Sequence, residues 1–129
     1  YWNFVRLSVG NNKLNTLSCS ELPYNTYELD LSKNNISKID SNCKHILGQI
    51  AILDLSCNQL VSNGINIQKD ILEKLHFVVS LKLAGNNIAE LQNPIRHFNL
   101  LNLDISSNPI TLSKIVGKID IIVKSYLQT

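Results

Sequence analysis

The sequence lacks the features that define several protein classes. No apolar run approaches the roughly 18 to 20 residues that a membrane helix needs, so we expect no membrane-spanning segment. The five glycines are scattered and form no phosphate-binding loop. The net charge of +2 is too small to indicate binding to nucleic acid or to an anionic membrane. Hydrophobic residues make up 44% of the 129 residues, which predicts a buried core within a single domain, residues 1–129.

Cysteine is also scarce. The three cysteines, Cys19, Cys43 and Cys57, are an odd number and exclude a fully paired disulfide framework. The cysteine-rich end segments of secreted repeat proteins are missing from this stretch. We therefore expect a reducing, cytoplasmic environment rather than a secreted protein.

What the sequence does contain is one eleven-residue pattern, L-x-x-L-x-L-x-x-N-x-L, repeated five times in register. Its asparagines recur after 22, 24, 28 and 22 residues. A chance distribution of leucine and asparagine would not reproduce this internal spacing. The five segments are residues 4–14 (FVRLSVGNNKL), 26–36 (TYELDLSKNNI), 50–60 (IAILDLSCNQL), 78–88 (VVSLKLAGNNI) and 100–110 (LLNLDISSNPI).

The spacing within the pattern predicts a short strand in each repeat. Side chains at positions 4 and 6 point to the same side of an extended chain, so we expect them in the core. Each strand should pair in parallel with the strand of the next repeat. The asparagine at position 9 can both donate and accept hydrogen bonds, so a row of these residues could satisfy the turns that follow the strands. The predicted core residues are Leu7, Val9, Leu29, Leu31, Leu53, Leu55, Leu81, Leu83, Leu103 and Ile105.

This pattern resembles the leucine-rich-repeat superfamily over about residues 4–110. The resemblance implies an α/β fold, a right-handed solenoid of five repeats with short parallel strands on its concave face and a helix or turns on its convex face. The 22-residue steps resemble the short intracellular-type repeats. The 28-residue step resembles the ribonuclease-inhibitor type.

Two segments outside the pattern are predicted to be helical. Residues 67–77 carry Ile67, Ile71, Leu72 and Leu75 at helical spacing and should form the one true convex helix. The other convex segments are too short for more than a turn or two, or are interrupted by proline.

The C-terminal residues 111–129 carry apolar residues at near-helical spacing and are predicted to form an amphipathic cap on the last repeat. The alternative is a truncated sixth repeat, since residues 119–123 are rich in β-branched side chains and could form a strand.

The concave face should display position 5 as one row: Ser8, Asp30, Asp54, Lys82 and Asp104. Strands lie about 4.8 Å apart, so we expect Lys82 to pair with Asp54, Asp104 or both. Asp30 and Asp54 are adjacent like charges, which cost stability. A cost without a local structural reason indicates that a basic group of a partner binds there, although an ordinary solvated face is the alternative.

Aromatic residues near this row could anchor a partner. Tyr27 at position 2, with Tyr24 just before it, is the best candidate, because tyrosine is favoured in binding hot spots. The alternative is that Tyr27 packs between repeats. The candidate partner-binding set is Tyr27, Glu28, Asp30, Asp54, Lys82 and Asp104. Reversing Asp30 and Asp54 to lysine should weaken partner capture and leave thermal stability nearly unchanged or raised.

The resemblance implies a protein–protein interaction module that binds a partner, which could carry a basic segment, through its concave face. Two alternatives are a scaffold element of an RNA-processing or export complex, and a fragment of a secreted or cell-surface receptor. The scattered basic residues and the net acidic concave face argue against nucleic acid. We expect no enzyme and no cofactor, because Cys43 and His45 lack a third catalytic group. We also expect no metal, since Asp30 and Asp54 on a flat sheet lack further ligands.

Two local features bear on the cellular compartment. Cys19 and Cys43 lie on convex segments of neighbouring repeats and could form a disulfide, although we favour separate thiols. Asn35-Ile36-Ser37 matches the acceptor pattern for N-glycosylation. Such a triplet arises easily by chance in a chain rich in asparagine and serine, so it weighs little here.

Overall fold

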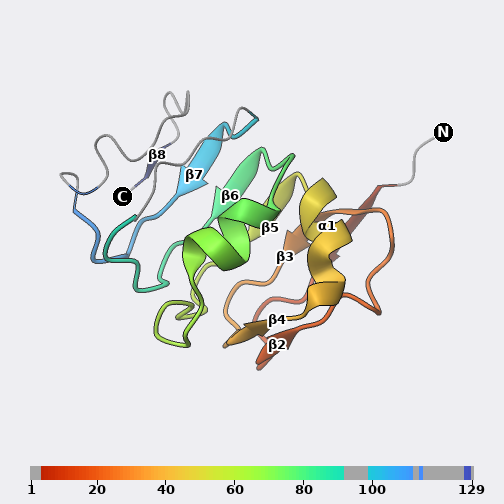
Figure 1. Cartoon of the computed structure of the whole chain (residues 1–129), viewed down its shortest axis with the longest axis horizontal. Helices are drawn as coiled ribbons and strands as arrows, with labels where there is room; N and C mark the ends of the chain where they lie inside the picture. The colour runs from red at the N-terminus through yellow and green to blue at the C-terminus, as the bar shows by residue number, and fades with distance from the viewer. Residues whose placement is uncertain (1–3, 92–98, 112–113, 115–126, 129) are drawn as a thin grey trace.

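All five repeats contribute a strand to one parallel sheet in the computed structural model (Figure 1). The structure describes residues 4–91, 99–111, 114 and 127–128. The sheet has the order β1-β3-β5-β6-β7-β8, so each strand lies beside that of the next repeat. The strands are β1 (Val5–Ser8), β3 (Thr26–Asp30), β5 (Ile52–Asp54), β6 (Ser80–Lys82), β7 (Asn102–Asp104) and β8 (Leu127–Gln128).

The register of the sheet follows the sequence pattern. The position-4 leucines align from strand to strand, Leu7 with Leu29, Leu29 with Leu53, Leu53 with Leu81 and Leu81 with Leu103. Leucines 29, 53, 81 and 103 are at most 1% exposed. The predicted strands, their parallel pairing and their inward side chains are therefore confirmed, but Leu7 and Val9 of the first repeat pack against the core while only partly buried.

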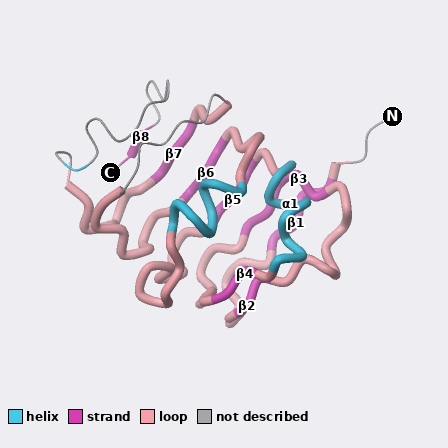
Figure 2. Tube along the Cα trace, viewed as in Figure 1, coloured by secondary structure: helices cyan, strands magenta, loops and turns pink. Residues whose placement is uncertain are grey.

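Helical turns cover one face of this sheet, as Figure 2 shows in cyan. They comprise η1 (Ser41–Cys43), α1 (Lys44–Gln49), η2 (Ile67–Ile71) and η3 (Leu72–Lys74). A second, two-stranded parallel sheet pairs β2 (Thr16–Leu17) with β4 (Lys38–Ile39). The fold is thus α/β with few helices, and no helix within the described residues is long and apolar enough to span a membrane.

The segment predicted as the one true convex helix, residues 67–77, is helical over Ile67–Lys74, but it is neither one continuous helix nor the one convex helix. A π-helical turn, η2, is followed by a 3₁₀ turn, η3, and the two meet at Ile71 with φ −122° and ψ −66°. Ile71 and Leu72 are both buried, although adjacent residues of a straight α-helix point about 100° apart. The change from π-helical to 3₁₀ hydrogen bonding between Ile71 and Leu72 directs both of these side chains into the core.

The α-helix within the described residues lies instead in the preceding repeat, at α1. Cys43, Ile46, Leu47 and Ile50 are at most 3% exposed and follow the i, i+3, i+4, i+7 spacing of a helix face. This helical spacing is present in the sequence. It was missed because it includes a cysteine and spans barely two turns.

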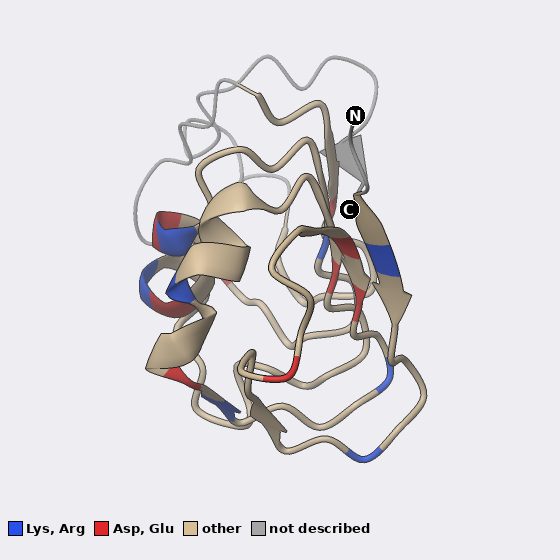
Figure 3. Cartoon of the chain, turned by 90° about the vertical axis from the view of Figure 1, so that its right-hand side faces the viewer, with Lys and Arg blue, Asp and Glu red and all other residues tan. Residues whose placement is uncertain are grey.

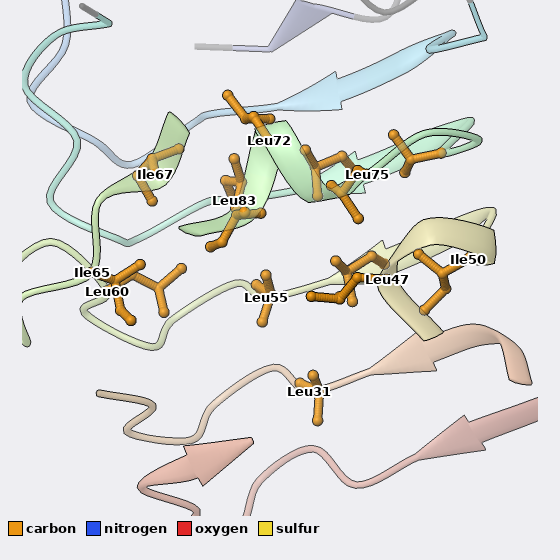
Figure 4. Packing of buried hydrophobic residues seen from close by; sticks show 14 of the residues in the cluster. Leu31, Leu47, Ile50, Leu55, Leu60, Ile65, Ile67, Leu72, Leu75 and Leu83 are labelled. Atoms are coloured by element: carbon orange, nitrogen blue, oxygen red, sulfur yellow. The ribbon is translucent and has the colours of Figure 1, made fainter. Parts of the chain in front are cut away.

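The core fills the space between the sheet and the helical turns (Figure 4). Leu31, Leu55 and Leu83, at position 6, point from the strand side into this space. They meet Leu47 of α1, Ile50 just after that helix, and Leu72 and Leu75 from the η2–η3 region, in one buried cluster. Each repeat therefore buries its apolar side chains against its neighbours.

The position-9 asparagines form the predicted ladder. From the second repeat on, each side-chain Nδ2 donates to carbonyls of its own and the preceding repeat, as Asn86 does to Leu83 and Leu55. Each Oδ1 accepts at least one backbone amide of the preceding repeat, and that of Asn86 accepts two, from Asn58 and Leu60. The same turn recurs in all five repeats, with left-handed φ at position 8: Asn11 58°, Lys33 57°, Cys57 59°, Gly85 67° and Ser107 55°.

Cys19 and Cys43 form a disulfide, with their Cα atoms 4.9 Å apart. The preference for separate thiols at these positions is therefore wrong, and the alternative is confirmed. The pairing of β2 with β4 brings the two segments together, and both cysteines are buried. Cys57 is free and exposed.

The predicted C-terminal cap falls mostly outside the described residues. The capping helix of residues 111–129 and the alternative strand at residues 119–123 both depend on residues 112–113 and 115–126, which lie outside the described residues. The described backbone of Leu127–Gln128 pairs with β7 as strand β8.

Candidate protein-binding surface

The face of the sheet away from α1, η2 and η3 is left uncovered by any helix within the described residues. We call it the open sheet face. Figure 3 shows the helices on one side of the core and the strands on the other, with acidic positions on neighbouring strands. Its side chains come from pattern positions 3 and 5 and are partly buried or exposed: Arg6, Ser8, Glu28, Asp30, Ile52, Asp54, Ser80, Lys82, Asn102 and Asp104.

The position-5 residues form the predicted row across the open sheet face. Asp30 is aligned with Asp54, Asp54 with Lys82, and Lys82 with Asp104. Ser8 lies beside Asp30 at the start of the row, where its hydroxyl donates to Asp30 Oδ2 at 3.2 Å. The structure therefore brings Asp30, Asp54, Lys82 and Asp104 together as expected.

The aspartates of the row also have a local structural role that the sequence interpretation missed. Asp30 Oδ1 accepts the backbone amide of Ser32 at 2.9 Å and the Ser32 hydroxyl at 2.7 Å. Asp104 Oδ1 makes the same two contacts with Ser106, at 2.9 and 2.6 Å. Asp54 Oδ1 accepts the amide of Ser56 at 2.9 Å. Each aspartate thus closes the turn that ends its strand.

The sequence carried a signal for these turns. Asp-x-Ser occurs in the second, third and fifth repeats, as residues 30–32, 54–56 and 104–106. In the first and fourth repeats position 5 is not aspartate, and position 7 is Gly10 or Ala84. Reversal of Asp30 and Asp54 to lysine would remove both turn acceptors, so we now expect it to lower stability rather than leave it unchanged.

Lys82 does not form the predicted ion pair with Asp54 or Asp104. Among the described residues, the ion pair on the open sheet face joins Arg6 Nη2 to Glu28 Oε2 at 3.2 Å. Asp54 and Asp104 each direct Oδ1 toward the end of their strand, where it accepts a serine amide. Lys82 is exposed and acts at longer range, since its charge helps to lower the pKa of Asp30.

Hydrogen bonding holds the pKa of Asp30 below its ordinary value. The Ser32 hydroxyl is the largest cause, and the Ser32 amide, the Ser8 hydroxyl and the charge of Lys82 act in the same direction. Burial acts in the opposite direction and raises the pKa, but it does not prevail. Asp30 therefore carries a full negative charge at neutral pH.

Replacing Ser32 by alanine should raise the pKa of Asp30 and lower the free energy of unfolding by about 0.5 kcal/mol at neutral pH, because solvent screens the partly exposed carboxylate. A carboxyl whose folded pKa is lowered stabilises the protein above its unfolded pKa, and this contribution is lost as the pH falls through the folded pKa. The difference in the free energy of unfolding between wild type and Ser32→Ala should therefore become smaller as the pH is lowered. Urea unfolding at neutral and acidic pH measures it.

Ser56→Ala is the matched control for this prediction. Ser56 gives Asp54 its backbone amide but no hydroxyl hydrogen bond, so this variant should retain wild-type stability at both pH values. Equal stability of the two variants at neutral pH would show that the Ser32 hydroxyl does not stabilise the Asp30 charge.

The two tyrosines differ in their surroundings. Tyr27 is half-buried and packs edge-on against Phe4 of the preceding repeat, with ring centroids 5.3 Å apart. This is the packing expected under the alternative interpretation of Tyr27. Tyr24 is 77% exposed and stacks on His45 at 4.0 Å. Of the two, Tyr24 offers the larger accessible aromatic surface.

An apolar patch beside the strands was not predicted. Phe77 is 60%, Val79 36% and Leu101 54% exposed, at or just before the starts of β6 and β7. The backbone amide of Leu101 donates to the Val79 carbonyl at 2.9 Å, so these two residues are neighbours. Val79 and Leu101 both occupy pattern position 2, where the third repeat carries the smaller Ala51.

The remaining surface shows no clustered chemistry in the part of the chain that is described. No group of three or more histidine, cysteine, aspartate or glutamate residues could hold a metal ion there. A cavity of about 370 Å³ has Glu90 as its ionisable lining residue, among apolar neighbours such as Ile65, Ile67 and Ile88. The charged rows of the open sheet face are therefore the main candidate site.

Comparison with known proteins finds a distant similarity. No model of a known protein family matches the sequence. Keratocan from Danio rerio, a leucine-rich-repeat protein, is 30% identical over 108 residues, which cover 84% of this chain and 29% of keratocan. The chain thus spans less than a third of the length of the relative that it matches. The similarity and the parallel sheet are both compatible with the leucine-rich-repeat pattern.

Proposed function

We propose that the chain is a leucine-rich-repeat solenoid that acts as a protein–protein interaction module, with the open sheet face as its concave binding surface. The observation that carries this proposal is the alignment of five strands. Because they pair in register, positions 3 and 5 form continuous rows on a face that no described helix covers. A partner can contact several repeats at once on such a surface.

The charges of the open sheet face favour a partner with a basic segment. Four acidic residues, Glu28, Asp30, Asp54 and Asp104, stand against Arg6 and Lys82. Arg6 is already paired with Glu28. Asp54 and Asp104 use Oδ1 for their turns, and the described hydrogen bonds leave Oδ2 of both free to accept from lysine or arginine.

A specific observation favours the secreted or cell-surface alternative over a cytoplasmic protein. Disulfides persist in oxidising compartments and are rare in the cytosol. The Cys19–Cys43 disulfide is buried within the stack, next to the paired strands β2 and β4. The proposed module therefore fits extracellular recognition better than intracellular scaffolding. A phosphate-binding role is disfavoured by the acidic row, which would repel nucleic acid.

The test is capture of partners from an extract of the source tissue. Asp30→Asn/Asp54→Asn removes two charges but keeps the amide oxygens that can accept the Ser32 and Ser56 amides. Loss of two charges that face a basic group should weaken binding by about 1.4 kcal/mol, or roughly tenfold. Immobilised wild type and variant are compared for the amount of each captured protein.

The matched control is Glu21→Gln/Glu73→Gln. It makes the same change in net charge at two exposed residues outside the strands. This control should capture partners as wild type does. Equal capture by all three proteins, or a loss confined to the control, would contradict the acidic row as a binding surface.

A further inference from the structure

Asn35 is the one asparagine, among the seventeen in the sequence, that begins an Asn-x-Ser/Thr acceptor pattern for N-glycosylation. Asn35 and the preceding residue, Asn34, differ in their exposure to solvent. Asn34 is buried, and its Nδ2 donates to the carbonyls of Val9, Leu31 and Ser32. Asn35 is exposed. The pattern thus marks the accessible member of the pair, beyond the end of β3.

The amide of Asn35 is oriented with its nitrogen available. Its Oδ1 accepts from Asn63 Nδ2 at 2.8 Å, while its Nδ2 donates to no described residue. The side chain of Ile36 is fully buried and holds the turn in place. Ser37 is exposed and donates its hydroxyl to the Asn15 carbonyl at 3.2 Å. The nitrogen that would carry a sugar therefore takes part in no hydrogen bond with the described residues.

The disulfide supplies an independent observation. Disulfides such as Cys19–Cys43 form and persist in oxidising compartments, among them those of the secretory pathway, where asparagine side chains also receive glycans. We infer that Asn35 is an N-glycosylation site, occupied in the same compartment that forms the Cys19–Cys43 disulfide.

The modification is a group transfer from a polyprenyl-diphosphate-linked oligosaccharide. Asn35 Nδ2 forms a bond to the anomeric carbon of the first sugar, and the bond from that carbon to the diphosphate oxygen breaks. Nδ2 gives up one proton to a base, and polyprenyl diphosphate leaves. No oxidant or reductant takes part.

The glycan would leave the proposed binding surface accessible. Asn35 lies after the turn that ends β3, and its side chain contacts Asn63 rather than any residue of the open sheet face. The inference does not depend on partner binding, so either proposal can fail without the other.

The first test uses the protein isolated from its source with an antibody. Its intact mass is measured before and after treatment with peptide-N-glycosidase, which releases the glycan and leaves aspartate at the modified position. We expect a loss of mass and aspartate at residue 35. An unchanged mass, with unmodified Asn35 in the peptide, would overturn the inference.

The second test assigns the site in the full chain, expressed behind a secretion leader in eukaryotic cells. Asn35→Gln and Ser37→Ala should each abolish the enzyme-sensitive mass, and Ser37→Thr should retain it. Asn87→Gln is the matched control, since Asn87 follows Asn86 as Asn35 follows Asn34, but Ala89 replaces the serine. Total cell extract is assayed with the medium, so that poor secretion does not hide a glycan. A glycan that persists on Asn35→Gln would place the modification elsewhere and reject the assignment.

Discussion

Replacing Asn58 by leucine should lower the free energy of unfolding by about 4 kcal/mol, because several buried backbone groups lose their partners at once. Asn58 is 0% exposed. Its Nδ2 donates to the carbonyls of Leu31 and Leu55 at 3.0 Å and of Ser56 at 3.2 Å. Its Oδ1 accepts the amide of Ile36 at 3.3 Å. Leucine has a similar size but offers none of these bonds.

The same substitution in the first repeat provides the control. Asn12 is exposed, and its Nδ2 donates to the carbonyls of Val9 and Gly10, both within its own repeat. Water can replace these bonds, so Asn12→Leu should cost less than about 1 kcal/mol. Urea unfolding followed by circular dichroism measures both variants. Similar losses of unfolding free energy in Asn58→Leu and Asn12→Leu would mean that burial between repeats does not determine how much each asparagine stabilises the fold.

Removal of the disulfide by Cys19→Ala/Cys43→Ala should lower the free energy of unfolding by about 3 kcal/mol, the value expected for a loop of this length. The bridge joins residues 24 apart in sequence and restricts the unfolded chain of two adjacent repeats. Wild type unfolded in the presence of a reductant should show the same loss, and the double variant should be insensitive to the reductant.

Cys57→Ala serves as the control for this prediction. Cys57 is free and exposed, so its replacement should change stability by less than about 0.5 kcal/mol. If wild type unfolds identically with and without reductant, the disulfide contributes nothing to stability and its structural role is refuted.

The strands and the ladder could be predicted because they follow from one short spacing. Alternation along a strand directs Leu29 and Leu31 inward and leaves Asp30 on the opposite side. The repeat then places Asp30 beside Asp54 without any further information. An asparagine that recurs in register at the end of each strand has few ways to make hydrogen bonds with the buried backbone groups of the turn. Its role in the ladder could therefore also be predicted.

Features that depend on how short segments are placed relative to one another could not be predicted from the repeat spacing. The spacing of Cys19 and Cys43 is compatible with free thiols or with a disulfide, and the pairing of β2 with β4 decides between them. The lack of an ion pair between Lys82 and either neighbouring aspartate has a similar origin. The alignment of strands predicted which carboxylates lie beside it, but the serine two residues further on determines where the oxygen of Asp54 or Asp104 points.

Carboxylate footprinting of the captured complex tests the proposed binding surface most directly. A water-soluble carbodiimide and an amine label accessible aspartate and glutamate side chains, and mass spectrometry of peptides reports the labelling at each position. The account predicts that bound partner lowers labelling of Asp30, Asp54 and Asp104 and leaves Glu21 and Glu73 unchanged. Unchanged labelling of the three aspartates, with protection of Glu21 or Glu73, would contradict it.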